Sequence, residues 1–308
     1  MRFSRNPKRV YGTSLAAILL AVIPITVAHA TESGVSVYPN GVETVMPGAM
    51  PGPGGSLLEQ FNNFYQANGL VDGNGHNLVP GFHLRVAAVA AKFVHNWGVH
   101  VFGGTLVSTA AAPFLYEHLN APFGEYDKSG LGNSDIETLV AYGKGPWHWW
   151  YGVDGYLPGP QYNKNDILNI GQHNFATAPA GAISYLPKHG QTEISSRFQY
   201  IVNFTNPANQ YRSGHEFIWE YAAMRNVVGK LAVGVNGDYY KQTTDDFQNG
   251  VIFRDGNRGR TLGIGPQIRY HLGHAALILK YQREMLVENR AVGNSFWFQF
   301  GMPVGRHE

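Results

Sequence analysis

The segment from Glu193 to Phe204 constrains the fold more than any other part of the chain. Its even-numbered positions are mostly apolar and its odd-numbered positions are mostly polar or charged. This two-residue period is typical of a β-strand with one apolar and one polar face. The same pattern returns at 261–272 and 295–302. A soluble sandwich also alternates, but long strands with many charged groups opposite the apolar face favour a membrane barrel with a wet interior.

The composition fits one large β domain and excludes several classes of function. The chain has 308 residues, of which 44% are hydrophobic and 14% charged. A net charge of +2 is too small to indicate nucleic acid as a partner. There is no cysteine, so disulfides, thiolate catalysis and Cys-ligated zinc are excluded. We predict no cofactor, and we assign no metal site.

The N-terminal 30 residues have the pattern of a secretory signal peptide. Basic residues up to Arg9 precede an apolar run from Leu15 to Ala28, and Ala28-His29-Ala30 predicts cleavage before Thr31. The alternative is a membrane anchor, but the run is shorter than the roughly 20 residues that a spanning helix needs. No later segment is apolar enough to span as a helix, so any membrane crossing must use strands. We therefore expect a signal at 1–30, a Pro/Gly-rich lead-in at 31–55 and a barrel at 56–308.

Twelve strands are predicted, and the connections between them alternate in length. Short links are expected at Asn96, 144–146, 188–190, 228–229 and 273–274, and longer ones at 70–81, 113–132, 159–173, 206–211 and 245–259. An outer-membrane barrel has short periplasmic turns and longer extracellular loops. The predicted strands are 60–69, 82–95, 97–112, 133–143, 147–159, 174–187, 191–205, 212–227, 230–244, 260–272, 275–288 and 294–304.

Several short motifs also resemble a known family across nearly the whole mature chain. These motifs are the opening from Glu32 to Glu43, the Pro/Gly run at 47–55, Tyr211-Arg-Ser-Gly214-His-Glu216, Gly237-Asp-Tyr-Tyr240-Lys-Gln242, Gly263-Ile-Gly-Pro266 and Asn289-Arg290. Together they resemble the family named for a meta-pathway of phenol degradation. The resemblance implies an outer-membrane β-barrel, transporter-like, found with aromatic-compound catabolism.

Strand alternation predicts which polar side chains line the lumen. One interpretation is a selectivity region that admits a polar or aromatic solute. The other is a network of paired charges that fills a narrow barrel, because an unpaired charge in a confined site is costly. The predicted lumen-lining residues are Glu193, Arg197, Asn203, Glu216, Glu220, Asn236, Asp238, Arg269, Lys280 and Glu284.

The longest late loop holds a second group of charged residues. They are candidates for contact with a ligand, lipopolysaccharide or calcium at the outer surface, but we favour the simpler interpretation of a solvated loop. The candidates for ligand contact are Asp245, Asp246, Arg254 and Asp255, with Arg258 and Arg260 beside them.

We find no sequence motif for an enzyme. The nucleophile elbow, the zinc-protease helix, the phosphate-binding loop and the dinucleotide fingerprint are all missing from the sequence. Ser213 and His215 resemble a Ser/His pair of a membrane hydrolase, but they alternate onto the predicted lipid face. We therefore predict a protein that is not an enzyme.

The sequence leads to one main functional hypothesis and one alternative. The main hypothesis is an outer-membrane channel for small hydrophobic or aromatic, phenol-type compounds. The alternative is a closed structural or surface-binding barrel, filled by its side chains and the lead-in. The expected partners are outer-membrane lipid, such a solute and the barrel assembly machinery, without nucleic acid.

Overall fold

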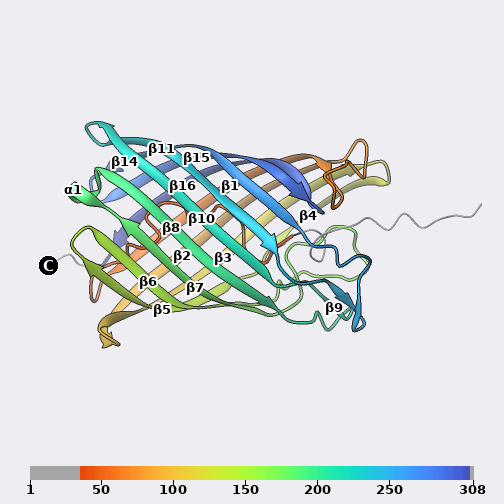
Figure 1. Cartoon of the computed structure of the whole chain (residues 1–308), viewed down its shortest axis with the longest axis horizontal. Helices are drawn as coiled ribbons and strands as arrows, with labels where there is room; N and C mark the ends of the chain where they lie inside the picture. The colour runs from red at the N-terminus through yellow and green to blue at the C-terminus, as the bar shows by residue number, and fades with distance from the viewer. Residues whose placement is uncertain (1–34, 306–308) are drawn as a thin grey trace, which may run out of the picture.

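A computed structural model describes residues 35–305 and shows a closed antiparallel barrel of twelve strands (Figure 1). The all-β fold predicted from the alternation is confirmed. The predicted signal peptide and its cleavage site lie outside the described residues. The wall is built from β1 (Ser56–Leu70), β2 (His83–Val101), β3 (Gly104–Ala121), β5 (Asp135–Lys144), β6 (Trp147–Tyr156), β7 (Ala176–Tyr185), β8 (Thr192–Asn203), β10 (Glu216–Val228), β11 (Leu231–Gln242), β14 (Arg260–Leu272), β15 (Ala275–Glu288) and β16 (Ala291–Val304).

The first and last strands close the barrel. β1 pairs with β2 along one edge and with β16 along the other, so no edge of the ring is left open between the two ends of the chain. The twelve-residue pairing of β1 with β2 continues into a long β2–β3 hairpin. Closure satisfies the backbone hydrogen bonds of these strands inside the wall, which a hydrocarbon surrounding requires.

The β2–β3 region differs from the prediction. A turn was expected at Asn96, but β2 continues to Val101 through a register shift between Asn96 and His100. The actual turn is at Phe102 and Gly103, where both residues have positive φ angles. The segment 113–132, expected as a loop, instead extends β3 and forms β4 (Gly124–Leu131). This short strand pairs with residues 114–121 at the end of β3. Where an apolar run has no two-residue period, the sequence does not show at which residue the strand ends.

The two ends of the barrel have different connections (Figure 1). One end carries short turns, for example at 229–230 and 273–274, and the single-turn helix α1 (Pro187–Gly190). The other end carries most of the long loops, including a small sheet of β9 (Tyr211–Arg212), β12 (Phe247–Gln248) and β13 (Val251–Ile252). The turn at 289–290, between β15 and β16, is a short connection at this long-loop end. In outer-membrane barrels the long-loop end faces the outside of the cell.

The wall is apolar outside and charged inside. Ile194, Phe198 and Phe296 on the outer face are 58%, 42% and 50% exposed. Arg197 and Lys280 on the inner face are each only 1% exposed. Within residues 35–305, no helix has the length and apolarity to cross a bilayer. Exposed hydrocarbon around buried charge is the arrangement of a protein that lies in lipid.

Candidate functional site

A Pro/Gly-rich segment occupies the lumen of the barrel. Residues 35–55, which we call the plug, run from the long-loop end, where Gln172 donates a hydrogen bond to the Val35 carbonyl, to the short-turn end. There, the Gly54 N–H donates to the Asn96 carbonyl at 2.9 Å. The plug has no strand of its own, so its backbone groups need partners from the wall.

Glu43 of the plug lies at the centre of a buried ion cluster. Its carboxylate pairs with Lys92 of β2 and with Arg197 of β8, whose Nε lies 3.0 Å from Oε2. Arg197 also lies 3.4 Å from Glu137 and stacks over the Tyr38 ring at 4.8 Å. Loss of this shared carboxylate is costly, because it leaves buried Lys92 without its ion pair and leaves Arg197 with only its longer contacts to Glu137, Asp154 and Glu220.

Two wall residues hold the plug by its backbone. The Lys280 ammonium donates to the carbonyls of Gly41 and Val42 at 2.6 and 2.8 Å, and to the Thr44 hydroxyl at 3.2 Å. Glu220 accepts from the Tyr38 hydroxyl at 2.6 Å and from the Glu43 N–H at 3.0 Å. Because both residues bind the same turn of the plug, they hold its backbone in place as well as balancing its charge.

Nearer the short turns, the plug packs closely against the wall. The Met46 N–H donates to Glu193 at 2.7 Å, and Glu193 also pairs with Arg269. The Trp150 indole donates to the Pro47 carbonyl at 2.6 Å. A Cβ at Gly48 would lie 2.5 Å from backbone atoms of β6 and β7, so only glycine allows this approach.

The predicted lumen residues are all at inward positions, but they serve different contacts. Glu193, Arg197, Glu220, Arg269 and Lys280 gather on the plug or on its partners, as described above. Glu216 accepts from Ser36 and from Asn203, which donates at 2.7 Å. The remaining three lie away from these plug contacts: Glu284 accepts from the Tyr65 hydroxyl at 2.8 Å, Asn236 donates to the Gly265 carbonyl at 3.1 Å, and Asp238 is 4% exposed.

Sequence analysis missed four members of the ion cluster. Glu43 lies in the lead-in, which carries no periodicity, while Lys92, Glu137 and Asp154 belong to strands β2, β5 and β6. Each of these three is a charged residue within a largely apolar stretch. A single charged residue at an inward position of an apolar strand could therefore have indicated a buried ion pair. The sequence could not show which residue is the partner, because the partners lie far apart in the chain.

The candidate loop residues have separate structural roles. Asp246 is buried, and its carboxylate accepts hydrogen bonds from Tyr211, from the Gly214 N–H at 2.7 Å and from Asn257 at 2.9 Å. Burial raises the pKa of Asp246 to about 7, although these hydrogen bonds act in the opposite direction. The other candidates lie nearer the surface: Asp245 pairs with Arg258 at 2.7 Å, the Arg254 guanidinium stacks over Phe253 at 5.0 Å, Asp255 accepts from the Asn257 N–H at 3.2 Å, and Arg260 pairs with Glu288.

A cavity of about 290 Å³ lies beside the plug. Its wall is formed by the inner faces of β1, β2 and β3, and it is largely apolar although the prediction was of a wet interior. Small side chains such as Ala88 and Ala111 leave the space that longer side chains fill elsewhere. We call this surface the apolar wall: Phe61, Leu84, Val86, Ala88, Ala90, Ala111, Pro113 and Leu115.

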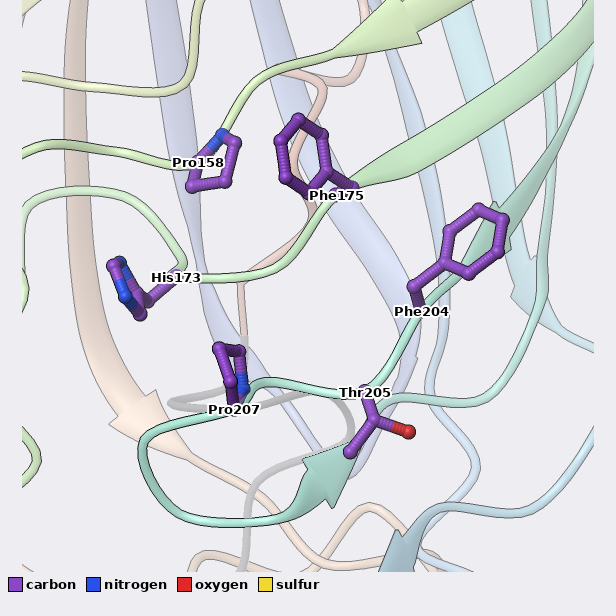
Figure 2. Close-up of a pocket in the computed structure, with 6 residues that line it drawn as sticks. All are labelled: Pro158, His173, Phe175, Phe204, Thr205 and Pro207. Carbon is purple, nitrogen blue, oxygen red and sulfur yellow. The ribbon is translucent and has the colours of Figure 1, made fainter.

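A second cavity, of about 520 Å³, lies at the long-loop rim (Figure 2). Phe175 and Phe204, both more than half exposed, come from the segments next to β7 and β8. Figure 2 shows Pro158 and His173 on the neighbouring loop and Pro207 beyond Phe204. Exposed aromatic rings at strand ends are typical of an interfacial girdle.

The described residues offer little for metal or hydrolase chemistry. No group of three or more His, Asp or Glu side chains between residues 35 and 305 is arranged to hold a metal ion. Ser213 is buried, and His215 Nδ1 accepts a hydrogen bond from the Asn203 N–H at 3.3 Å.

The apolar exterior, the closed ring and the charged lumen define an outer-membrane β-barrel. The family model described as "Putative MetA-pathway of phenol degradation" matches residues 67–300. The chain therefore belongs to this family, and the resemblance seen in its motifs is confirmed. None of the curated proteins compared with the chain matches it in sequence.

Solved structures with a similar fold are also outer-membrane proteins. The COG4313 outer membrane channel from Pseudomonas putida F1 aligns with a TM-score of 0.71 at 14% identity, covering 87% of this chain and 100% of that one. The CymD monoaromatic hydrocarbon channel gives 0.44 at 10% identity, covering 92% and 99%. A FadL homologue from Pseudomonas aeruginosa gives 0.41 at 7%, covering 91% and 98%. The last two scores are too low to support any inference about this chain.

Proposed function

We propose that the protein is a passive outer-membrane channel for small hydrophobic or aromatic compounds and not an enzyme. The observation that carries the proposal is the cavity between the plug and the apolar wall. Charged residues such as Lys92 and Arg197 also border this cavity, but the apolar wall presents mostly hydrocarbon to a solute that lies against it. Family membership supports a link to aromatic catabolism.

The plug decides what kind of channel this is. An open water-filled pore would pass ions and sugars, but the ion cluster around Glu43 fills the centre of the lumen. A hydrophobic solute needs no continuous water column, because it gains free energy by leaving water for apolar surface. The proposal is therefore a selective path along the apolar wall, with the plug excluding hydrophilic solutes.

A closed structural barrel is the second candidate, and the density of plug contacts favours it. The two candidates differ in uptake. We expect cells that lack the gene to take up a radiolabelled phenolic compound more slowly at limiting concentration, and expect the restored gene to recover the rate. Equal rates in the two strains would support the closed barrel.

One pair of variants tests the path itself. Ala88→Trp places a large ring in the cavity, whereas Ala91→Trp places the same ring on the outer face of the same strand, where Ala91 is exposed. We expect Ala88→Trp to abolish the gene-dependent uptake and Ala91→Trp to preserve it, with both proteins present at wild-type levels in the outer membrane. Equal uptake by both variants would contradict a path along the apolar wall.

A further inference from the structure

Arg290 differs from the other cations inside the barrel. It lies in the short turn between β15 and β16 and lines the cavity at its long-loop end. Its guanidinium stacks over the Tyr240 ring at 4.1 Å. Its Nη1 atom is buried and has no hydrogen-bond partner among the residues that the structure describes.

The remaining lumen cations are matched by oxygen atoms. Lys92 and Arg197 share Glu43, Arg269 pairs with Glu193, and Lys280 is surrounded by three oxygens of the plug. For Arg290, by contrast, no carboxylate oxygen of residues 35–305 lies within 4.0 Å of the guanidinium, the distance that defines an ion pair. Arg290 is half-buried, but its Nη1 is buried without a partner in the described part of the chain. A buried N–H without an acceptor is costly, so this position suits an anionic acceptor.

The two acidic residues nearest in the fold are engaged by neutral donors. Glu216 accepts from Ser36 and Asn203, and Glu284 accepts from the Tyr65 hydroxyl and from the Gly293 N–H at 2.7 Å. Their negative charge helps to keep a cation in this part of the lumen. Neither carboxylate lies within hydrogen-bonding distance of the buried Nη1 of Arg290, and Arg290 is one of the residues that line the cavity.

We propose that Arg290 binds the carboxylate of a small aromatic or similarly apolar acid, whose ring lies against the apolar wall. This inference rests on the proposed channel function and names the substrate class more narrowly. A guanidinium suits the role because its planar N–H groups match a carboxylate in two parallel hydrogen bonds. A volume of about 290 Å³ is at the lower end of small-molecule sites, so it suits a single ring.

The test compares two ligands that differ in charge but hardly in shape. Benzoate and benzyl alcohol are titrated by calorimetry into the purified full-length mature protein in detergent. We expect benzoate to bind at least about tenfold more tightly than benzyl alcohol, because a charge-assisted bidentate pair replaces a neutral contact.

Variants of Arg290 locate the effect. Arg290→Gln is expected to weaken benzoate binding by about ten- to a hundredfold and to change benzyl alcohol binding by less than about twofold. Arg290→Lys keeps the charge without the planar fork, so an intermediate loss is expected. Arg283→Gln, on the exposed outer face of β15, is the matched control and should bind both ligands like the wild type.

The outcomes separate this proposal from the channel proposal. Equal wild-type affinity for the two ligands, or a parallel loss of both in Arg290→Gln, would overturn the anion site and leave the channel standing. Binding of neither ligand would remove the cavity as a solute site and count against both proposals. The wild-type comparison holds even if Arg290→Gln fails to fold.

Discussion

On one side of the plug, charged side chains of β8, β10 and β15 contact it directly, and Arg269 of β14 supports them by pairing with Glu193. On the other side most inward side chains of β2 and β3 near the cavity are small or apolar, although Lys92 of β2 reaches Glu43. We call the first side the gripping wall, formed by Glu193, Arg197, Glu220, Arg269 and Lys280. The contrast lies in side-chain reach. The long side chains of glutamate, arginine and lysine extend to the plug, whereas the short side chains of Val86 and Ala88 on β2 border a cavity.

This difference separates two tasks within one lumen. The gripping wall holds the plug by hydrogen bonds and ion pairs, and in the proposed channel the held plug excludes water-soluble compounds. The apolar wall provides surface without strong contacts, so a solute can bind and leave it. A channel must bind its solute weakly enough to release it. We infer that the charges of this protein serve mainly closure and that its selectivity belongs to the cavity.

The largest expected effect comes from removing the Glu43 carboxylate, which lies at the centre of the buried ion cluster. Glu43→Ala leaves Lys92 and Arg197 without their shared carboxylate, and breaking a buried pair costs about 3–5 kcal/mol. We expect faster hydrogen exchange throughout residues 35–55 and a new ion current in planar bilayers.

Glu125→Ala is the matched control for that substitution. Glu125 has a 63% exposed side chain whose carboxylate lies 3.6 Å from His118, so its removal should leave both measurements unchanged. A wild-type exchange pattern in Glu43→Ala would show that the plug is held by its shape and backbone contacts alone.

A smaller effect is expected on the apolar wall. Leu115→Ala removes apolar contacts from a side chain that borders an existing cavity, so a loss near the lower end of the core range is expected, about 2 kcal/mol. Denaturant unfolding in lipid vesicles measures it. Exchange in the plug should not change, because Leu115 makes no polar contact with it. A plug that loosens as much as in Glu43→Ala would erase the distinction between the two walls.

Sequence patterns predicted the wall of the barrel better than its contents. Strands such as β8 and β14 are half lipid-exposed and half charged, so their alternation specifies both strand and facing. The central run of β2, from Val86 to Ala91, is apolar on both faces, so the sequence shows neither the end of the strand at Val101 nor the cavity that this run lines. A two-residue period appears only when the two faces of a strand differ in polarity. Strands β2 and β3 are apolar on both faces near the cavity, so their sequence shows no such period.

The position of the plug could not be predicted for a different reason. Its Pro/Gly composition excluded regular structure, but its contacts join residues far apart in the chain: Glu43 meets Arg197, and Gly41 meets Lys280. Such pairs are brought together by the closed barrel and not by nearness in the sequence. Arg290 illustrates the same limit, because its unmatched N–H is visible only once all other charges have been paired in space.

The loop above the gripping wall continues the polar network outside the barrel, and this predicts a pH effect. Burial raises the pKa of Asp246 to about 7, above its ordinary value, so the folded loop favours the protonated acid. Stability of the loop should fall as pH rises from about 4 to about 7, where the proton is lost. We expect residues 243–259 to open about a hundredfold more often at pH 8 than at pH 5, because about two pH units separate pH 5 from the folded pKa and each unit is a factor of ten.

Hydrogen exchange corrected for its intrinsic pH dependence measures this opening. Asp246→Asn cannot ionise, so its opening rate should be independent of pH over the same range. An equally strong pH dependence in Asp246→Asn would assign the effect to another group.

The loop above the apolar wall is predicted to respond with the opposite sign and the smallest amplitude. Asp72 is in an exposed turn, where hydrogen bonds from the backbone N–H groups of His76 and Asn74 lower the pKa of its carboxyl. A lowered pKa stabilises the turn above the ordinary aspartate range, and this stability is lost as pH falls through the folded value. We therefore expect exchange in residues 72–77 to accelerate below about pH 4, and Asp72→Asn to remove the acceleration. If both loops lost protection in the same direction, the polar network would not distinguish the two sides of the lumen at the outer surface.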